Sequence, residues 1–296
     1  MQKKYRAIEF FSGIGAFRQV GHEFGATTIE AFDQGEDANS VYSLNYNYIP
    51  KTRNLDSIKL GQIKEADLWW MSPPCLPYTR KGNGCDVEDS RAQSFLNLLN
   101  LVPQILPERI LIENVPEFKD SKAMQLLEET LKKHSYNFKT FDLCSSQFGT
   151  PMLRRRFFVV ASRIGLIEDI ELKEQERKTL SSFLKNQKDL DQSLYLNDDM
   201  LSQAKIMEAF DIVEKDANRL TCFTSSYGRQ HKASGSLYRD TNNKIRYFAA
   251  EEIVALLGFS NDFKFPAHLS NQAKWRLAGN SVDTRIILLL LKASGL

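Results

Sequence analysis

Cys75 and Glu113 are the residues whose types and surroundings first point to chemistry in this sequence. Cys75 lies in the stretch MSPPCLPYT, residues 71–79, where prolines stiffen the chain directly after an apolar run. Taken alone, such a cysteine is most often buried packing in a turn, and such a glutamate is most often a helix-capping carboxylate. Together, a thiolate and a neighbouring carboxyl group form a nucleophile with a proton donor or hydrogen-bond partner.

A second set of residues is typical of a nucleoside site. The stretch FFSGIGAF, residues 10–17, follows an apolar run and opens a helical pattern, and its glycines let the backbone approach a ligand closely. Asp33 ends the next apolar run, where a carboxylate can accept hydrogen bonds from a ribose diol, and Asp56 follows further on. The third glycine of a dinucleotide fingerprint is absent. These residues indicate a nucleoside-containing ligand and leave a dinucleotide and S-adenosylmethionine equally open.

The elements that must position these residues follow from the apolar pattern. Buried strands are predicted at residues 7–11, 28–32, 68–71, 109–112 and 157–161. Helices are predicted from 89 to 102, from 121 to 133, over 250–258 and over 284–292. This alternation predicts an α/β fold with a doubly wound, mostly parallel sheet. Because the carboxyl ends of parallel strands share one edge, Cys75 and Glu113 are expected to line the same crevice.

The bulk properties are those of an ordinary soluble globular protein. The chain has 296 residues, of which 42% are hydrophobic and 26% charged, and a net charge of +2. Four cysteines without CxxC spacing and four histidines predict neither a metal site nor a disulfide scaffold. We see no secretory signal and no apolar run long enough to span a bilayer. The expected location is intracellular, in the cytoplasm or, for a eukaryotic protein, also the nucleus.

The charge is unevenly distributed after the core pattern fades. Residues 165–216 carry thirteen acidic and seven basic side chains, whereas residues 219–246 carry six basic and one acidic, with three aromatics among them. The second segment is either a solvated loop or a surface that contacts phosphates and stacks on bases. We therefore predict a catalytic core at 1–164, a small target-recognition region at 165–245, and a return to the core at 246–296.

Five motifs, in order along the chain, resemble those of the cytosine-5 methyltransferase family. They are FSGIG (residues 11–15), PPCLPYT (73–79), ENV (113–115), MLRRR (152–156) and GNSV (279–282). The chain departs from the family pattern at Leu76 and Met152, where glutamine is usual, and at Ala16, where glycine is usual. Gln34 replaces a bulky residue that many relatives stack on adenine. None of these departures changes a reacting group.

The resemblance implies a catalytic role for four residues. Cys75 would attack carbon 6 of a cytosine, and Glu113 would hold or protonate the ring nitrogen N3. Arg154 and Arg156 would position the base and stabilise developing charge. Carbon 5 would then take a methyl group from S-adenosyl-L-methionine, leaving S-adenosyl-L-homocysteine. A base would remove the carbon 5 proton and release Cys75, and the cytosine must leave its stack to reach the site.

The same resemblance implies the residues that hold the cofactor. The turn after the first strand would supply backbone contacts, Asp33 would bind the ribose, and Leu55 and Asp56 would bind the adenine. The complete set is Ile14, Gly15, Ala16, Asp33, Leu55, Asp56, Ser72, Ser94, Asn280, Ser281 and Val282.

Within the family, the chain is most similar to the branch that methylates tRNA-Asp at an anticodon-loop cytosine. The likeness rests on PYTR at 77–80 followed by DSR at 89–91, on CFT with YG between 222 and 228, and on residues 248–259. The implied nucleic-acid-binding residues are Thr79, Arg80, Arg91, Cys222, Phe223, Thr224, Tyr227, Arg229 and Lys232. The implied partner is tRNA, with DNA as the alternative. A catalytically silent nucleic-acid-binding relative is the alternative of another class. We expect a monomer that binds no membrane.

Overall fold

The computed structural model describes residues 4–79, 85–172, 175–202, 208–230 and 232–296 of the chain. The chain forms two compact units. Unit 1 comprises residues 1–143, 155–171 and 286–296, and unit 2 comprises residues 144–154 and 172–285. The catalytic core was expected at 1–164, but residues 144–154 of that range belong to unit 2. Residues 246–285, which were expected to return to the core, also belong to unit 2.

Unit 1 is built on a six-stranded sheet with the strand order β2-β1-β3-β4-β7-β5. Its strands are β1 (Tyr5–Phe10), β2 (Ala26–Phe32), β3 (Leu68–Met71), β4 (Arg109–Asn114), β5 (Asn137–Cys144) and β7 (Arg155–Ser162). The first four are parallel neighbours, whereas β7 pairs antiparallel with β4. The predicted α/β fold with a mostly parallel sheet is confirmed. β5 was not predicted because its sequence, NFKTFDLC, mixes polar and apolar residues instead of forming a continuous apolar run.

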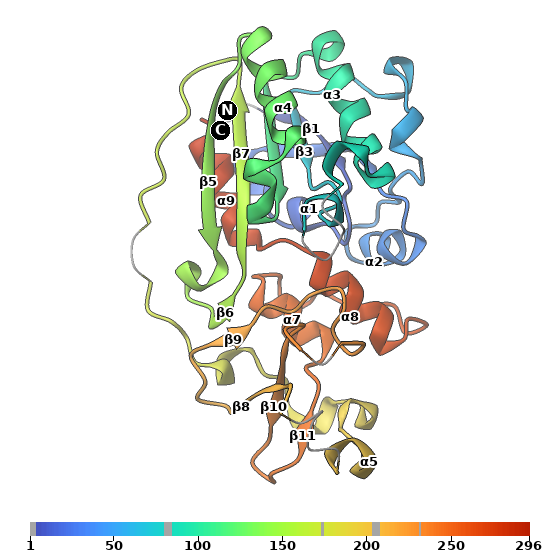
Figure 1. Ribbon diagram of the computed structural model, residues 1–296, viewed down its shortest axis with the longest axis vertical. Helices are drawn as coiled ribbons and strands as arrows, with labels where there is room; N and C mark the ends of the chain where they lie inside the picture. The colour runs from blue at the N-terminus through green and yellow to red at the C-terminus, as the bar shows by residue number, and fades with distance from the viewer. Residues whose placement is uncertain (1–3, 80–84, 173–174, 203–207, 231) are drawn as a thin grey trace. The chain divides into compact units, whose positions relative to one another are not determined.

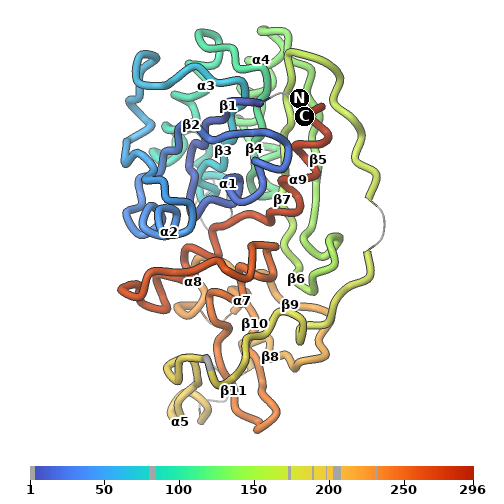
Figure 2. Tube along the Cα trace, turned by 180° about the vertical axis from the view of Figure 1, so that it is seen from behind, coloured from blue at the N-terminus to red at the C-terminus, as the bar shows by residue number. Residues whose placement is uncertain are grey.

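Helices cover both faces of this sheet. They are α1 (Ala16–Gly21), α2 (Glu36–Tyr46), α3 (Gln93–Ile105), α4 (Lys122–Lys133) and α9 (Thr284–Ala293). Figures 1 and 2 show α3 and α4 on one face and α1 and α9 on the other. Neighbouring tryptophans of β3 point to opposite faces: Trp69 contacts Phe10 edge-on, and Trp70 stacks on Phe17 of α1. In the described ranges, no helix combines the length and apolarity needed to cross a membrane.

The four parallel strands end side by side. Phe10 of β1 is in register with Phe32 of β2 and with Met71 of β3, and Met71 is in register with Ile112 of β4. The loops that leave these strands therefore begin at one edge of the sheet, which is where open α/β sheets bind their ligands.

Unit 2 contains short strands and helices around an aromatic core. A three-stranded sheet has the order β11-β10-β8, and β6 pairs with β9. The elements are β6 (Met152–Leu153), β8 (Asp211–Val213), β9 (Leu220–Thr221), β10 (Ser236–Arg239), β11 (Ile245–Arg246), α5 (Asp198–Leu201), α7 (Ala250–Leu256) and α8 (Asn271–Asn280). Residues 246–285 belong here because Tyr247 and Trp275 pack against Tyr227, and because buried Arg246 pairs with Glu252 at 2.8 Å.

Candidate active site

Cys75 lies in the loop that follows β3. A single 3-10 turn, Leu76–Tyr78, begins directly after it, and Pro77 lies in this first turn. The backbone N–H of Tyr78 donates to the carbonyl oxygen of Cys75 at 3.0 Å. The Cys75 side chain is half-buried against the hydrophobic core of unit 1. The loop therefore holds the sulfur at a fixed place while part of its surface stays open.

Glu113 is buried at the end of β4 and forms an ion pair with Arg156 of β7. The Arg156 Nε to Glu113 Oε1 distance is 3.1 Å, and the side chains are 17% and 9% exposed. The antiparallel pairing of β4 with β7 places Glu113 opposite Phe158, so that Arg156 is two residues away on the neighbouring strand. A paired, buried carboxylate has one orientation, since breaking the pair would leave an uncompensated charge.

Asn114 connects the Glu113 strand to the Cys75 loop. Its Nδ2 donates to the carbonyl oxygen of Pro73 at 3.2 Å, and its Oδ1 accepts from the N–H of Val115 at 2.8 Å. The side chain is 1% exposed. The sequence showed Asn114 only as the middle residue of a motif and assigned it no role. The available sequence signal was an asparagine at the end of a predicted apolar strand. A side-chain amide that is buried in such a place bonds to backbone.

The turn between β1 and α1 is held by Asp33. One carboxylate oxygen of Asp33 accepts from the N–H of Gly13, and the other accepts from the N–H of Gly35, both at 2.8 Å. Burial raises the pKa of Asp33 above its ordinary value, and these two hydrogen bonds oppose the rise. Asp33, the residue predicted to bind the ribose, thus lies beside the predicted glycine turn.

The residues around this turn fit S-adenosyl-L-methionine. A Cβ at Gly13 would meet no heavy atom within 4 Å, which leaves open space beside the turn. The Ser12 hydroxyl is buried and has no hydrogen-bond partner among the described residues. Asp33 offers acceptors for a ribose diol, and Asp56, bonded by the Ser94 hydroxyl, offers one for an adenine amine.

The other predicted cofactor residues of unit 1 line or support the same loops. Ile14, Gly15, Ala16 and Leu55 are buried. The Ser72 hydroxyl donates to the carbonyl oxygen of Phe11 at 2.9 Å, which joins the loop after β3 to the turn after β1. Gln34, which stands where many relatives have a bulky residue, donates to Asn54 Oδ1 at 3.1 Å.

Glu9 is a buried carboxylate that the sequence did not single out. Its Oε1 accepts from the hydroxyls of Thr28 and Tyr42, each at 2.7 Å, and its Oε2 has no partner among the described residues. Desolvation raises the pKa of Glu9 to about 7, although both hydrogen bonds and the charge of Arg18 oppose the rise. The one available signal was its charge within the apolar run of the first strand.

Arg154 belongs to unit 2, where it connects two of the predicted motifs. It is 3% exposed. Its Nη1 donates to the carbonyl oxygen of Phe223 at 3.0 Å and contacts Cys222 Sγ at 3.5 Å, and its Nη2 donates to the carbonyl oxygens of Gly279 and Ser281. These bonds hold backbone, whereas Arg156 bonds the Glu113 carboxylate. The segment that Arg154 holds contains three residues predicted to contact the cofactor, Asn280, Ser281 and Val282, and it belongs to unit 2.

The predicted nucleic-acid-binding residues differ in accessibility. Phe223 and Tyr227 are each 1% exposed, and their rings meet edge-on at 4.9 Å. Of the two interpretations of this segment, neither a solvated loop nor a base-stacking surface describes these two rings, because both are buried in an aromatic core. Arg229 and Lys232 are exposed, and Cys222 and Thr224 are half-buried.

Two further residues of that prediction lie after Cys75. Thr79 is half-buried and its hydroxyl donates to the carbonyl oxygen of Leu76 at 3.3 Å. Arg91 is exposed, and its Nε donates to Asp89 Oδ1 at 2.8 Å. Arg80 lies outside the described residues.

Known cytosine-5 methyltransferases are similar to this chain over nearly its whole length. Residues 5–294 match the family described as C-5 cytosine-specific DNA methylase. A tRNA (cytosine(38)-C(5))-methyltransferase of Schizosaccharomyces pombe is 30% identical, over 98% of this chain and 96% of the relative. A DNA (cytosine-5)-methyltransferase of Dictyostelium discoideum is also 30% identical, over 98% and 94%. The structure of a methyltransferase of Entamoeba histolytica matches with a TM-score of 0.91 at 32% identity, over 99% of this chain and 98% of that one.

Proposed function

The chain belongs to the C-5 cytosine-specific DNA methylase family, and we propose that it transfers a methyl group from S-adenosyl-L-methionine to carbon 5 of a cytosine in tRNA. The proposed target is an anticodon-loop cytosine of tRNA-Asp. The observation that carries the chemistry is the Glu113–Arg156 ion pair, at 3.1 Å, on the strand next to the one that leads into the Cys75 loop. The observation that supports tRNA is the full-length likeness to a relative named for cytosine 38 of tRNA.

The side chains of unit 1 can carry out the covalent part of this reaction. The Cys75 thiolate forms a bond from Sγ to carbon 6, the electron pair of the 5,6 double bond shifts to the bond between carbons 4 and 5, and N3 takes up a proton. Glu113 holds the proton at N3, so that negative charge does not accumulate on the ring, and Arg156 fixes the orientation of Glu113. The Asn114 bond to the Pro73 carbonyl keeps the Cys75 loop beside the Glu113 strand.

The cofactor and a base complete the reaction. S-adenosyl-L-methionine, when bound, supplies an electrophilic methyl group, and Gly13, Asp33 and Asp56 are the residues proposed to hold it. Carbon 5 becomes nucleophilic in the Cys75 adduct. In the unmodified aromatic ring, carbon 5 is too weakly nucleophilic to take the methyl group directly. Removal of the carbon 5 proton by a base then restores the 5,6 double bond and expels Cys75 Sγ with the electron pair of the C–S bond, so that the Cys75 thiolate is regenerated.

A single-stranded loop suits this reaction, because an unpaired cytosine is extruded at less cost than a paired one. Exposed Arg229 and Lys232 of unit 2 are proposed to contact tRNA phosphates. We propose that residues 165–245 recognise the target, that the chain acts as a monomer, and that it works inside the cell, where tRNA is found.

The direct test offers tRNA-Asp and duplex DNA side by side with labelled S-adenosyl-L-methionine. We expect methylation of tRNA, loss of it in Cys75→Ala by at least about a thousandfold, and normal rates in the control Cys85→Ala, whose cysteine lies outside the reacting loop. Preferential methylation of DNA would contradict the tRNA assignment. Full turnover by Cys75→Ala would contradict the nucleophile.

DNA is the second candidate substrate, because the equally similar Dictyostelium discoideum relative is named a DNA methyltransferase. The covalent chemistry is the same for both, so only the paired assay separates them. A catalytically silent binding protein is disfavoured, since Cys75 and the Glu113–Arg156 pair are all present.

A further inference from the structure

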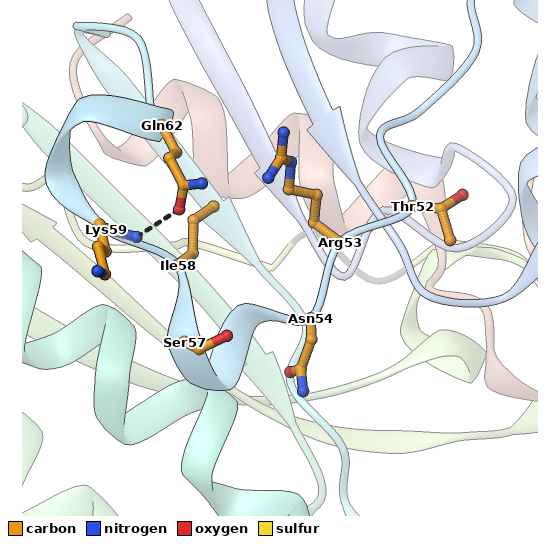
Figure 3. A pocket seen from close by; sticks show the side chains of 7 residues that line it. All are labelled: Thr52, Arg53, Asn54, Ser57, Ile58, Lys59 and Gln62. Atoms are coloured by element: carbon orange, nitrogen blue, oxygen red, sulfur yellow. Dashed lines mark hydrogen bonds between the residues drawn. The ribbon is translucent and has the colours of Figure 1, made fainter.

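A polar pocket of about 580 Å³ in unit 1 has no role in the chemistry described above. It lies between the chain segment that follows α2 and the two short turns that come after that segment (Figure 3). Its polar lining consists of Thr52, Arg53, Asn54, Ser57, Lys59 and Gln62, and buried Ile58 completes it. Two cations, two hydroxyls and two amides therefore surround one space, and no carboxylate is among its lining residues.

Side-chain amides hold the walls of this pocket in place. Asn39 Nδ2 of α2 donates to the Thr52 hydroxyl at 3.0 Å. Asn97 Nδ2 of α3 donates to the carbonyl oxygens of Leu55 and Ile58, at 2.8 and 3.0 Å. Irregular backbone needs such partners to keep one conformation. The pocket is thus a preformed cradle, because both of its walls are bonded to helices.

The two cations of the pocket are available to a ligand. In the part of the chain that the structure describes, neither Arg53 nor Lys59 makes a side-chain hydrogen bond or ion pair, and both are exposed. Residues 51–64 carry four basic side chains and one acid, Asp56, which is bonded by the Ser94 hydroxyl. Lys51 is ion-paired with Glu30, so the positive charge left for a ligand here is that of Arg53 and Lys59.

The chemistry of the lining selects a phosphate. A guanidinium, an ammonium and hydroxyl donors are the groups with which proteins bind phosphate oxygens. The methyl donor carries a positively charged sulfonium centre, and the partners proposed for its adenine and ribose ends are Asp56 and Asp33, which are not among the lining residues of this pocket. The other substrate, a nucleic acid, carries a phosphate at every nucleotide of its backbone.

We propose that this pocket binds a backbone phosphate of the tRNA substrate through Arg53 and Lys59. The inference rests on the proposed function, because tRNA supplies the phosphate. Asn54 connects the pocket to the cofactor loops, since its Oδ1 accepts from Gln34 Nε2 at 3.1 Å and from the Asp56 N–H at 2.8 Å. A test must therefore change the two cations and leave Asn54 intact.

The experiment measures tRNA-Asp binding by the full chain carrying Cys75→Ala, over a series of KCl concentrations. The compared variants are Arg53→Gln, Lys59→Gln and both together, with Lys133→Gln, an exposed cation of α4, as the matched control. For the double variant we expect a roughly tenfold loss of affinity near 0.1 M salt. The slope of log K against log salt should fall by about 0.7 to 0.9 for each phosphate that the variant no longer neutralises. In the otherwise unmodified chain, the KM for tRNA should rise while kcat and the KM for S-adenosyl-L-methionine stay constant.

Three results would overturn the inference. The double variant could keep the salt slope of Lys133→Gln, which would leave the pocket without a role in tRNA binding. It could raise only the KM for the methyl donor, which would make the pocket part of the cofactor site. Inorganic phosphate alone could bind in an Arg53-dependent way with no change in tRNA binding, which would make it a small-anion site. Failure of the proposed function is separate, because the unmodified chain would then methylate no tRNA.

Discussion

Two residues that take no part in the bond changes, Arg156 and Asn114, hold the reacting residues Glu113 and Cys75 in position. Arg156 bonds Glu113, and Asn114 bonds the carbonyl of Pro73 two residues before Cys75. Neither interaction moves a proton or forms a covalent bond. Each removes a rotational or backbone freedom that the reaction would otherwise have to restrict at the moment of attack. At the residue scale, the site is therefore preorganised by buried Asn114 and half-buried Arg156 on adjacent strands.

Glu9 gives the residue scale a measurable pH dependence. Its pKa is about 7 in the folded chain and 4.5 in the unfolded one, so between these pH values the folded state holds a proton that the unfolded state has released. Stability contributed by Glu9 is fully present below pH 4.5 and is lost as the pH rises to about 7. We predict that Glu9→Gln, which stays neutral and keeps an acceptor for Tyr42 and Thr28, removes this loss.

The measurement is urea unfolding of both proteins from pH 4.5 to pH 8. The free energy of unfolding of Glu9→Gln should gain on that of the unmodified chain by about 3 kcal/mol across this range. Glu23→Gln, which changes an exposed carboxylate, serves as the control and should show no such gain. Parallel pH curves for Glu9→Gln and the unmodified chain would refute the raised pKa.

At the element scale, the turn between β1 and α1 contains two glycines with different tasks. Gly15 has a φ of +88°, and a Cβ there would lie 2.3 Å from Tyr46 Cε2. Gly13 has a φ of +54°, and a Cβ there would meet nothing within 4 Å. Gly15 is therefore required by packing inside the protein, whereas Gly13 leaves room for a ligand.

These environments predict opposite defects for two identical substitutions. Gly15→Ala should lower the free energy of unfolding by roughly 2–4 kcal/mol, because backbone strain adds to a clash with the half-buried Tyr46 ring. Gly13→Ala should cost only about 1 kcal/mol of backbone strain, but should weaken S-adenosyl-L-methionine binding at least about tenfold. Thermal unfolding and calorimetric titration of both variants give the comparison. Unchanged cofactor affinity in Gly13→Ala would exclude the turn as its binding site.

The elements also show what can be read from this sequence and what cannot. Apolar runs predicted β1 to β4, because a buried parallel strand leaves no polar face. They did not predict β5, whose residues are mostly part-exposed, or the antiparallel direction of β7, since direction depends on the connection and not on composition. Aromatic residues in a basic segment left a solvated loop and a stacking surface open, but Phe223 and Tyr227 form a core. Composition alone does not separate these outcomes, because an aromatic ring suits either environment.

At the scale of the whole molecule, unit 1 takes its residues from both ends of the sequence. Residues 286–296 belong to it together with residues 1–143. Arg109 of β4, which is 4% exposed, donates from Nε to the carbonyl oxygen of Ser294 at 2.7 Å and from Nη2 to that of Gly295 at 3.1 Å. The strand that carries Glu113 is thus bonded to the last helical segment, so the catalytic sheet cannot be complete until that segment is present.

Deletion of residues 286–296 should therefore prevent unit 1 from folding. It removes the buried side chains Ile286, Ile287, Leu290 and Leu291, at about 2 kcal/mol each, and takes from the Arg109 guanidinium its two carbonyl acceptors at Ser294 and Gly295. That sum of about 8 kcal/mol is comparable to the entire stability of a typical domain. Lys292→Ala, at an exposed position of the same helix, should unfold at the temperature of the unmodified chain. Cooperative thermal unfolding and S-adenosyl-L-methionine binding by the deleted chain would show instead that residues 1–171 form the catalytic sheet unaided.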